Sequence, residues 1–220
     1  MMDNALIFIE IVLINVLLSG DNALVIAMAS QGLPPKQRRK AVWWGAGAAV
    51  VLRCALTVVA LALLQIPFLQ AAGAALLLII AVKLLTDAGG GHGNAQLAKP
   101  ASLGNAVWTI VAADFVMSLD NVLAIAAVAQ GDLILILLGI ATSIPMIIWG
   151  SQLLGSLLQR FPALTYAGAG LLAYAAGEML VKDPGMSRFL LRGPESLPEL
   201  IPLLCVPFVI AAAVIRKKPV

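Results

Sequence analysis

The chain consists of long runs of apolar residues that are separated by short clusters of Pro, Gly and charged residues. Residues 41–64 and 133–158 form two such runs, and each exceeds the about 20 residues that an α-helix needs to cross a bilayer. The apolar residues are continuous and do not alternate with polar ones, and the runs far exceed the roughly ten residues of a membrane barrel strand. The pattern therefore predicts an all-α membrane protein with seven transmembrane helices, at residues 5–29, 41–64, 68–86, 103–129, 133–158, 162–181 and 197–215.

The composition agrees with a membrane location. Apolar residues make up 61% of the 220 residues and charged residues only 11%, whereas a soluble fold has about a quarter of its residues charged. The net charge of +3 comes from loops and the C-terminal tail, and no basic face with interleaved aromatic residues indicates nucleic-acid binding. Cys54 and Cys205 both lie in apolar runs, which is typical of small buried side chains and not of a disulfide framework.

The distribution of basic residues predicts the orientation. Four of the five residues 36–40, in the loop after the first span, are Lys or Arg. If this loop is cytoplasmic, the alternation of spans also places Lys99, Arg160 and the tail 216–218 inside, and leaves outside only three basic residues after the sixth span. The positive-inside rule therefore predicts a multi-pass protein of the bacterial inner membrane, with the N-terminus outside and the C-terminus in the cytoplasm.

The chain repeats itself. Residues 17–27 resemble residues 116–126, with Ser, Asp and Asn at matching positions, and residues 72–77 resemble residues 167–172. Each copy contains three predicted spans, and because three is odd, the second copy enters the membrane from the opposite side. This predicts two inverted three-helix repeats, which many secondary transporters arrange around one central site, plus a seventh helix without a counterpart.

We expect one membrane domain over residues 1–220. Its parts are the first repeat (5–86), a Gly-rich cytoplasmic linker (87–102), the second repeat (103–181) and the seventh helix (197–215). The single histidine, His92, lies in the linker, where a solvated residue is the simpler interpretation and metal sensing or delivery the alternative.

Acids and amides inside the spans are the candidate functional residues. A carboxylate in the bilayer interior costs several kcal/mol, so it rarely persists without a partner or a function. Carboxylate and amide oxygens suit the hard cations Mg²⁺, Ca²⁺ and Mn²⁺ and disfavour copper and zinc. We therefore expect a metal site made by Asp21, Asn22, Asp114, Asp120, Asn121 and Asn15. Polar contacts between helices are the alternative for the amides, but they do not account for three buried acids.

Further polar or soft side chains lie near this motif. Met117 shares a helical face with Asp114 and Asn121, where its thioether favours Mn²⁺, although a packing role is the commoner one for Met. Ser19, followed by Gly20, is expected to break the first helix and turn Asp21 inward, and Ser118 occupies the matching position in the second copy.

Four other charged residues are candidates for secondary roles. Lys83 and Glu178 are repeat equivalents, so they are expected to pair or relay protons, with snorkelling to the interface as the alternative for Lys83. Glu10 lies three turns before Asp21, at a vestibule for ion entry, and Arg53 lies inside the second span.

These motifs resemble the TerC family of integral membrane proteins, in particular its YjbE-type branch. The resemblance is carried by Leu-Ser-Gly-Asp-Asn-Ala at residues 18–23, Leu-Pro-Pro-Lys-Gln-Arg-Arg at 33–39 and Ala-Asp-Phe-Val-Met-Ser-Leu-Asp-Asn-Val at 113–122. It implies a seven-span inner-membrane protein of metal-ion homeostasis with Mn²⁺ efflux as its activity. The implied acidic residues are Asp21, Asp114 and Asp120, each motif Asn following its Asp. Many relatives have an acid where this chain has Asn15, which lowers the charge of the site by one.

Together these features predict a secondary transporter that exports divalent metal ions, Mn²⁺ above all, by cation/proton antiport with alternating access. Mn²⁺ is the transported substrate, and no cofactor is expected. The Gly-rich linker lacks the Gly-Lys-Ser/Thr ending of a nucleotide-binding loop, and no catalytic constellation indicates an enzyme. The alternatives are an amino-acid exporter of the lysine-exporter-like class and a non-catalytic membrane factor that supplies metal to secreted proteins. The oligomeric state stays open, a homo-oligomer included.

Overall fold

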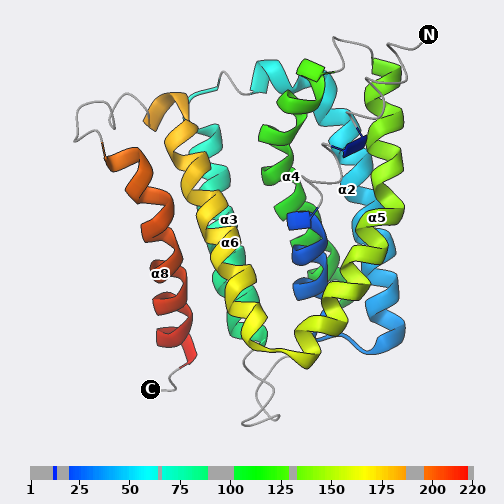
Figure 1. The fold of residues 1–220 in the computed structure, drawn as a ribbon, viewed down its shortest axis with the longest axis vertical. Coiled ribbons are helices and arrows are strands. Elements are labelled where there is room, and N and C mark those ends of the chain that lie inside the picture. Colours follow the sequence, from blue (N-terminus) through cyan, green and yellow to red (C-terminus); the bar gives the residue numbers. More distant parts are fainter. Residues whose placement is uncertain are drawn as a thin grey trace.

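The computed structural model of the chain describes residues 12–13, 20–63, 66–88, 102–128, 133–186 and 196–217, apart from some side chains within the helices. Residues 20–30 are helical, and six longer helices follow. Their bounds are α2 Pro35–Leu63, α3 Leu69–Ala88, α4 Leu103–Val128, α5 Leu133–Arg160, α6 Ala163–Lys182 and α8 Leu197–Lys217 (Figure 1). No strand occurs in these ranges, so the prediction of an all-helical protein is confirmed.

Four helices are long and apolar enough to cross a membrane within the part of the chain that the structure describes. These are Leu69–Asp87, Leu137–Arg160, Ala163–Lys182 and Leu197–Arg216. The last six predicted spans coincide with helices to within a few residues, except that α2 begins at Pro35, six residues before the predicted start at residue 41. The first predicted span, residues 5–29, lies partly outside the described residues. A proline is well placed in the first turn of a helix, so the basic residues after it extend α2 beyond its apolar part.

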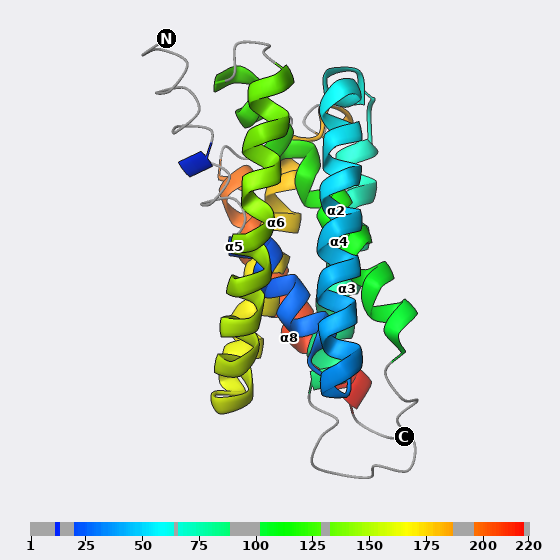
Figure 2. The same ribbon diagram turned by 90° about the vertical axis from the view of Figure 1, so that its right-hand side faces the viewer.

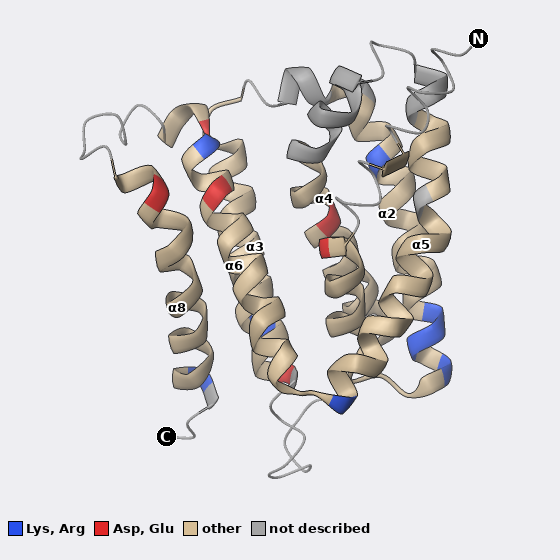
Figure 3. Ribbon diagram, viewed as in Figure 1, with Lys and Arg blue, Asp and Glu red and all other residues tan. Residues whose placement is uncertain are grey.

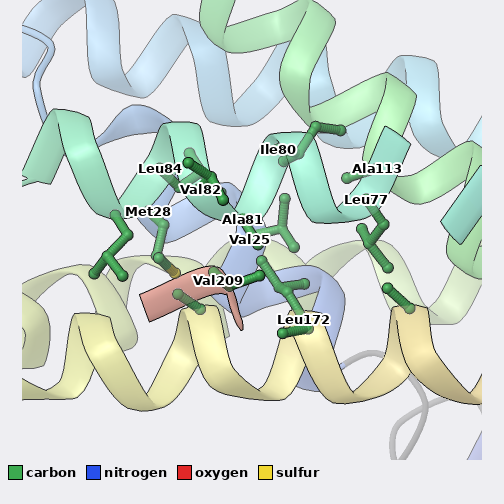
Figure 4. Packing of buried hydrophobic residues seen from close by; sticks show 14 of the residues in the cluster. Val25, Met28, Leu77, Ile80, Ala81, Val82, Leu84, Ala113, Leu172 and Val209 are labelled. Atoms are coloured by element: carbon green, nitrogen blue, oxygen red, sulfur yellow. The ribbon is translucent and has the colours of Figure 1, made fainter. Parts of the chain in front are cut away.

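The helices form two packed groups. α2, α4 and α5 lie on one side and α3, α6 and α8 on the other, and α3 contacts α4 between them (Figures 1 and 2). The helix of residues 20–30 supplies buried side chains to both groups. Val25 and Met28 pack in a cluster with side chains of α3, α4, α6 and α8 (Figure 4). Ile26 packs in a separate cluster with Ile110 of α4 and Ile147 of α5.

Small residues allow the helices to approach closely, as is common in membrane bundles. A Cβ added to Gly177 of α6 would lie 2.4 Å from Cα of Pro202 on α8, so the two backbones nearly touch there. A Cβ on Gly45 of α2 would lie 2.7 Å from Cδ1 of Ile110 on α4. The absence of a side chain at these positions is what sets the spacing of the two helix pairs.

The outer surface is apolar. All four tryptophans, Trp43, Trp44, Trp108 and Trp149, point outward with 54–73% of their surface exposed, and large aliphatic side chains of α5 and α8 do the same. Contiguous exposed apolar surface on this scale is unfavourable in water and matches a lipid environment. The chain is therefore an integral membrane protein with several apolar helices.

Basic residues gather at one end of the bundle. The start of α2, with Lys36, Arg38, Arg39 and Lys40, lies at the same end as Arg160 of α5 and Arg216 of α8 (Figure 3). The end of α3 and the start of α4 lie at this end as well (Figure 1).

At the end of the bundle opposite the basic residues, Asp183 joins the end of α6 to the start of α3 through hydrogen bonds. Its side chain is fully buried, and its carboxylate accepts hydrogen bonds from the backbone N–H groups of Phe68 (3.0 Å), Ala71 (3.1 Å), Gly185 (2.7 Å) and Met186 (3.0 Å). Phe68 has a left-handed backbone (φ 65°), which is rare for a bulky residue and is held here by its bond to Asp183. Burial alone raises the pKa of Asp183, but the four N–H donors outweigh it and leave the pKa below its usual value.

Candidate functional site

A pair of opposite charges lies in the interior between α2 and α4. The guanidinium of Arg53, in the second half of α2, forms an ion pair through Nη2 with Oδ1 of Asp114 on α4. The side chains are 1% and 6% exposed, respectively. Neither charge reaches water, so the partner compensates part of the large cost of burying each of them.

Ser118 completes the group. It lies one helical turn after Asp114, on the same face of α4, and its hydroxyl accepts a hydrogen bond from Nε of Arg53 at 3.0 Å. The same hydroxyl donates to Oδ2 of Asp114 at 3.1 Å. Both oxygens of the carboxylate are therefore engaged, Oδ1 by the guanidinium and Oδ2 by the serine.

A small cavity adjoins the ion pair. It measures about 10 Å³, which is the lower limit for one water molecule. Its polar lining comes from Asn22, Arg53 and Asp114, and its walls are aliphatic side chains of the helix 20–30, α2, α4 and α5. Asn22 is 3% exposed, so an amide of the first sequence copy and a carboxylate of the second line the same small cavity.

The two residues of the first Asp-Asn motif face different directions. Asn22 is buried at the cavity, whereas Asp21 is exposed. Consecutive residues of an α-helix point about 100° apart, and residues 20–30 are regular helix, so one residue turns inward and its neighbour does not.

Several predicted site residues fall outside the described part of the chain. Asn15, Ser19 and Glu10 are among them, as are the side chains of Asp120 and Asn121. Among the described residues, no three Asp, Glu, Cys or His side chains come together as a metal-binding group. The six-residue oxygen site therefore stays a prediction.

The remaining candidates have individual surroundings. Met117 is buried in the main apolar cluster, in keeping with the packing interpretation. Lys83 donates from Nζ to Oγ1 of Thr109 on α4 (3.4 Å), and Glu178 pairs with Lys182 one turn later on α6 (3.3 Å). The expected Lys83–Glu178 pair is thus replaced by two other contacts. Lys83 lies close enough to α4 to contact Thr109, and Glu178 has Lys182 as a cationic neighbour on the same helix.

Sequence reasoning did not identify the partner of Arg53 or the role of Asp183. A signal existed for each. Arg53 is a cation deep in an apolar span, and such a charge needs an acid on a neighbouring helix. Asp183 is followed by Pro184 and Gly185, and Asp-Pro-Gly after a helix is typical of a turn whose carboxylate accepts backbone hydrogen bonds.

Comparison with known proteins agrees with the architecture. The family described as "Integral membrane protein TerC family" matches residues 2–219. A Bacillus subtilis (strain 168) protein described as "Uncharacterized membrane protein YjbE" is 44% identical over 212 residues, covering 96% of this chain and 95% of that protein. No solved structure matches the chain. With a family match over nearly the whole length and a relative of this similarity, the chain belongs to the TerC family of integral membrane proteins.

Proposed function

We propose that the protein is a secondary transporter that exports divalent metal ions, Mn²⁺ above all, across the inner membrane. The observation that carries the proposal is the placement of Asp114, a carboxylate buried mid-bundle with Asn22 beside the same cavity. An acid inside a membrane bundle is costly and typically marks an ion pathway. Carboxylate and amide oxygens are the ligands that hard divalent cations prefer.

The proposed architecture has seven transmembrane helices in two inverted repeats of three, plus the seventh. The contact between α3 and α6, which are repeat equivalents, supports this arrangement. They run in opposite directions, since the end of α6 meets the start of α3 through Asp183. The common end of the basic residues of α2, α5 and α8 supports a cytoplasmic C-terminus and an external N-terminus.

In the proposed mechanism, Asp114 and Asn22 bind a partly dehydrated cation together with Asp120 and Asn121. Asp21, which is exposed in this structure, joins them when the helix of residues 20–30 turns. The two halves rock against each other and expose the ion to each side in turn. Asp114 or Glu178 exchanges protons on the return leg, so the proton gradient drives export. The metal is cargo, and no covalent chemistry is involved.

The size of the cavity favours an ion over an amino acid as the substrate. A space for about one water is close to the size of a dehydrated cation, whereas an amino acid requires a much larger pocket. The alternative role, a membrane factor that supplies metal to secreted proteins, can be told apart from a transporter. Such a factor does not by itself carry ions across a membrane.

Flux through the purified protein tests the proposal. The protein is reconstituted into liposomes with an inward or outward pH gradient, and Mn²⁺, Ca²⁺, Mg²⁺ and Zn²⁺ fluxes are recorded with metal-sensitive dyes. We expect saturable Mn²⁺ flux that depends on the pH gradient and is not inhibited by amino acids. Absence of flux for every cation, with correctly folded protein, would contradict the proposal.

A further inference from the structure

We propose that Arg53 is a tethered counter-cation: it occupies the Asp114 carboxylate when no metal is bound, and a metal ion must displace it to bind. This inference rests on the proposed function, since it assigns the regulation of the same site. Binding is then an exchange of one cation for another, so the Asp114 carboxylate always has a cationic partner. The proton exchange of the return leg then falls to Glu178.

The geometry at Asp114 makes displacement necessary. Oδ1 is taken by Nη2 of Arg53, and Oδ2 accepts from Ser118, which is itself bonded to Nε of Arg53. A metal ion that coordinates Asp114 must break this group, and it cannot lie beside the guanidinium without close repulsion between like charges.

The guanidinium of Arg53 also does not use all of its hydrogen-bond donors. Within the part of the chain that the structure describes, its buried Nη1 has no hydrogen-bond partner. A guanidinium has five N–H donors, so a purely structural arginine in this place is expected to use both terminal nitrogens. These unused donors raise the free energy of the state in which Arg53 is paired with Asp114. A metal ion therefore displaces the arginine more easily.

Displacement has a consequence for the helices. The cavity beside the pair has room for about one water molecule, which is less than a guanidinium needs. We therefore expect Arg53 to leave Asp114 through a movement of α2 relative to α4. Since α2 belongs to the first half of the chain and α4 to the second, cation binding is coupled to a movement between the halves.

Direct Mn²⁺ binding to protein in nanodiscs tests the inference, with unbound Mn²⁺ measured by electron paramagnetic resonance. Arg53→Gln removes the charge but keeps a hydrogen-bonding side chain, and we expect it to bind Mn²⁺ at least tenfold more tightly than the wild type. Arg53→Lys keeps the charge with fewer contacts, and we expect a smaller increase. Arg160→Gln is the matched control, since Arg160 is exposed at the end of α5, and its affinity should not change.

The outcomes separate this inference from the proposed function. Equal or weaker Mn²⁺ binding by Arg53→Gln, while the wild type binds Mn²⁺ and Asp114→Asn does not, overturns the counter-cation role and leaves the proposed function standing. No binding by any variant overturns both.

A second measurement covers the case in which Arg53→Gln does not fold. Saturating Mn²⁺ should increase the labelling of Arg53 in the wild type by phenylglyoxal, quantified by peptide mass spectrometry. Unchanged labelling of Arg53 despite bound Mn²⁺ also overturns the inference.

Discussion

Arg53 of α2 and Asp114 of α4 form a buried ion pair although they are 61 residues apart in the chain. The pair joins the two sequence copies at a place where a carboxylate, an amide and a small cavity meet. The same two charges therefore contribute both to the packing of α2 against α4 and to the state of the candidate ion site.

The stability of the bundle should depend on this pair in a non-additive way. Asp114→Leu or Arg53→Met alone leaves one uncompensated buried charge, so we expect each to lower the free energy of unfolding by about 3–5 kcal/mol. The double variant removes both charges and should recover most of that loss. Unfolding in mixed detergent micelles measures all four proteins. Additive losses in the double variant would show that the two residues act independently.

Transport should depend on the acids of both motif copies. We expect Asp21→Asn and Asp120→Asn each to abolish Mn²⁺ flux in proteoliposomes, because each removes a negative charge from a site that must balance a divalent ion. Folding should be unaffected, as judged by size-exclusion profiles and thermal melting. Asp87→Asn, at the exposed end of α3, is the matched control and should retain flux. Wild-type flux in Asp21→Asn or Asp120→Asn would exclude that residue from the site.

The carboxylate of Asp183 should stabilise the protein in a pH-dependent way. Its pKa in the folded protein lies below the usual Asp value, so its contribution is fully present above about pH 4, the unfolded pKa, and is lost as the pH falls through the folded pKa. Asp183→Asn keeps one acceptor oxygen but loses the charge, and we expect a loss of about 1–3 kcal/mol at pH 7. The difference in melting temperature between wild type and variant should shrink below pH 4. A gap that is constant with pH would contradict this explanation.

The packing of α6 against α8 should leave no room for a side chain at residue 177, which is Gly. Its Cβ would lie 2.4 Å from the backbone of Pro202, so Gly177→Ala must push the helices apart, and we expect a destabilisation of about 1–3 kcal/mol. Gly47→Ala in α2 is the control, since a Cβ there meets nothing within 4 Å, and it should be neutral or slightly stabilising. Thermal unfolding in detergent compares the two, and equal melting temperatures would argue against tight α6–α8 packing.

The helices and the family could be predicted from the sequence because both depend on local information. Continuous apolar runs gave the helices to within a few residues, and the duplicated Asp-Asn motif identified the TerC family, which the comparison confirms. The start of α2 was less predictable, because a basic segment after Pro35 continues the helix without an apolar signal.

The candidate site was predictable only in part. The burial of Asn22 and Asp114 agrees with the expectation that polar residues of the motif face the interior. The exposure of Asp21 does not follow from the motif, since it depends on the rotation of one helix relative to its neighbours. The pairings of Lys83 with Thr109 and of Glu178 with Lys182 likewise depend on which helices are adjacent.

By itself, the sequence determined that the chain is a helical membrane protein with acids and amides inside its spans, since hydrophobicity and charge are properties of each segment alone. The tertiary structure decided which charges compensate one another. Arg53 meets Asp114, and Asp183 meets the start of α3, only because helices distant in the chain pack side by side. In a medium without water, every buried charge needs a partner, and only the packing of the bundle supplies it.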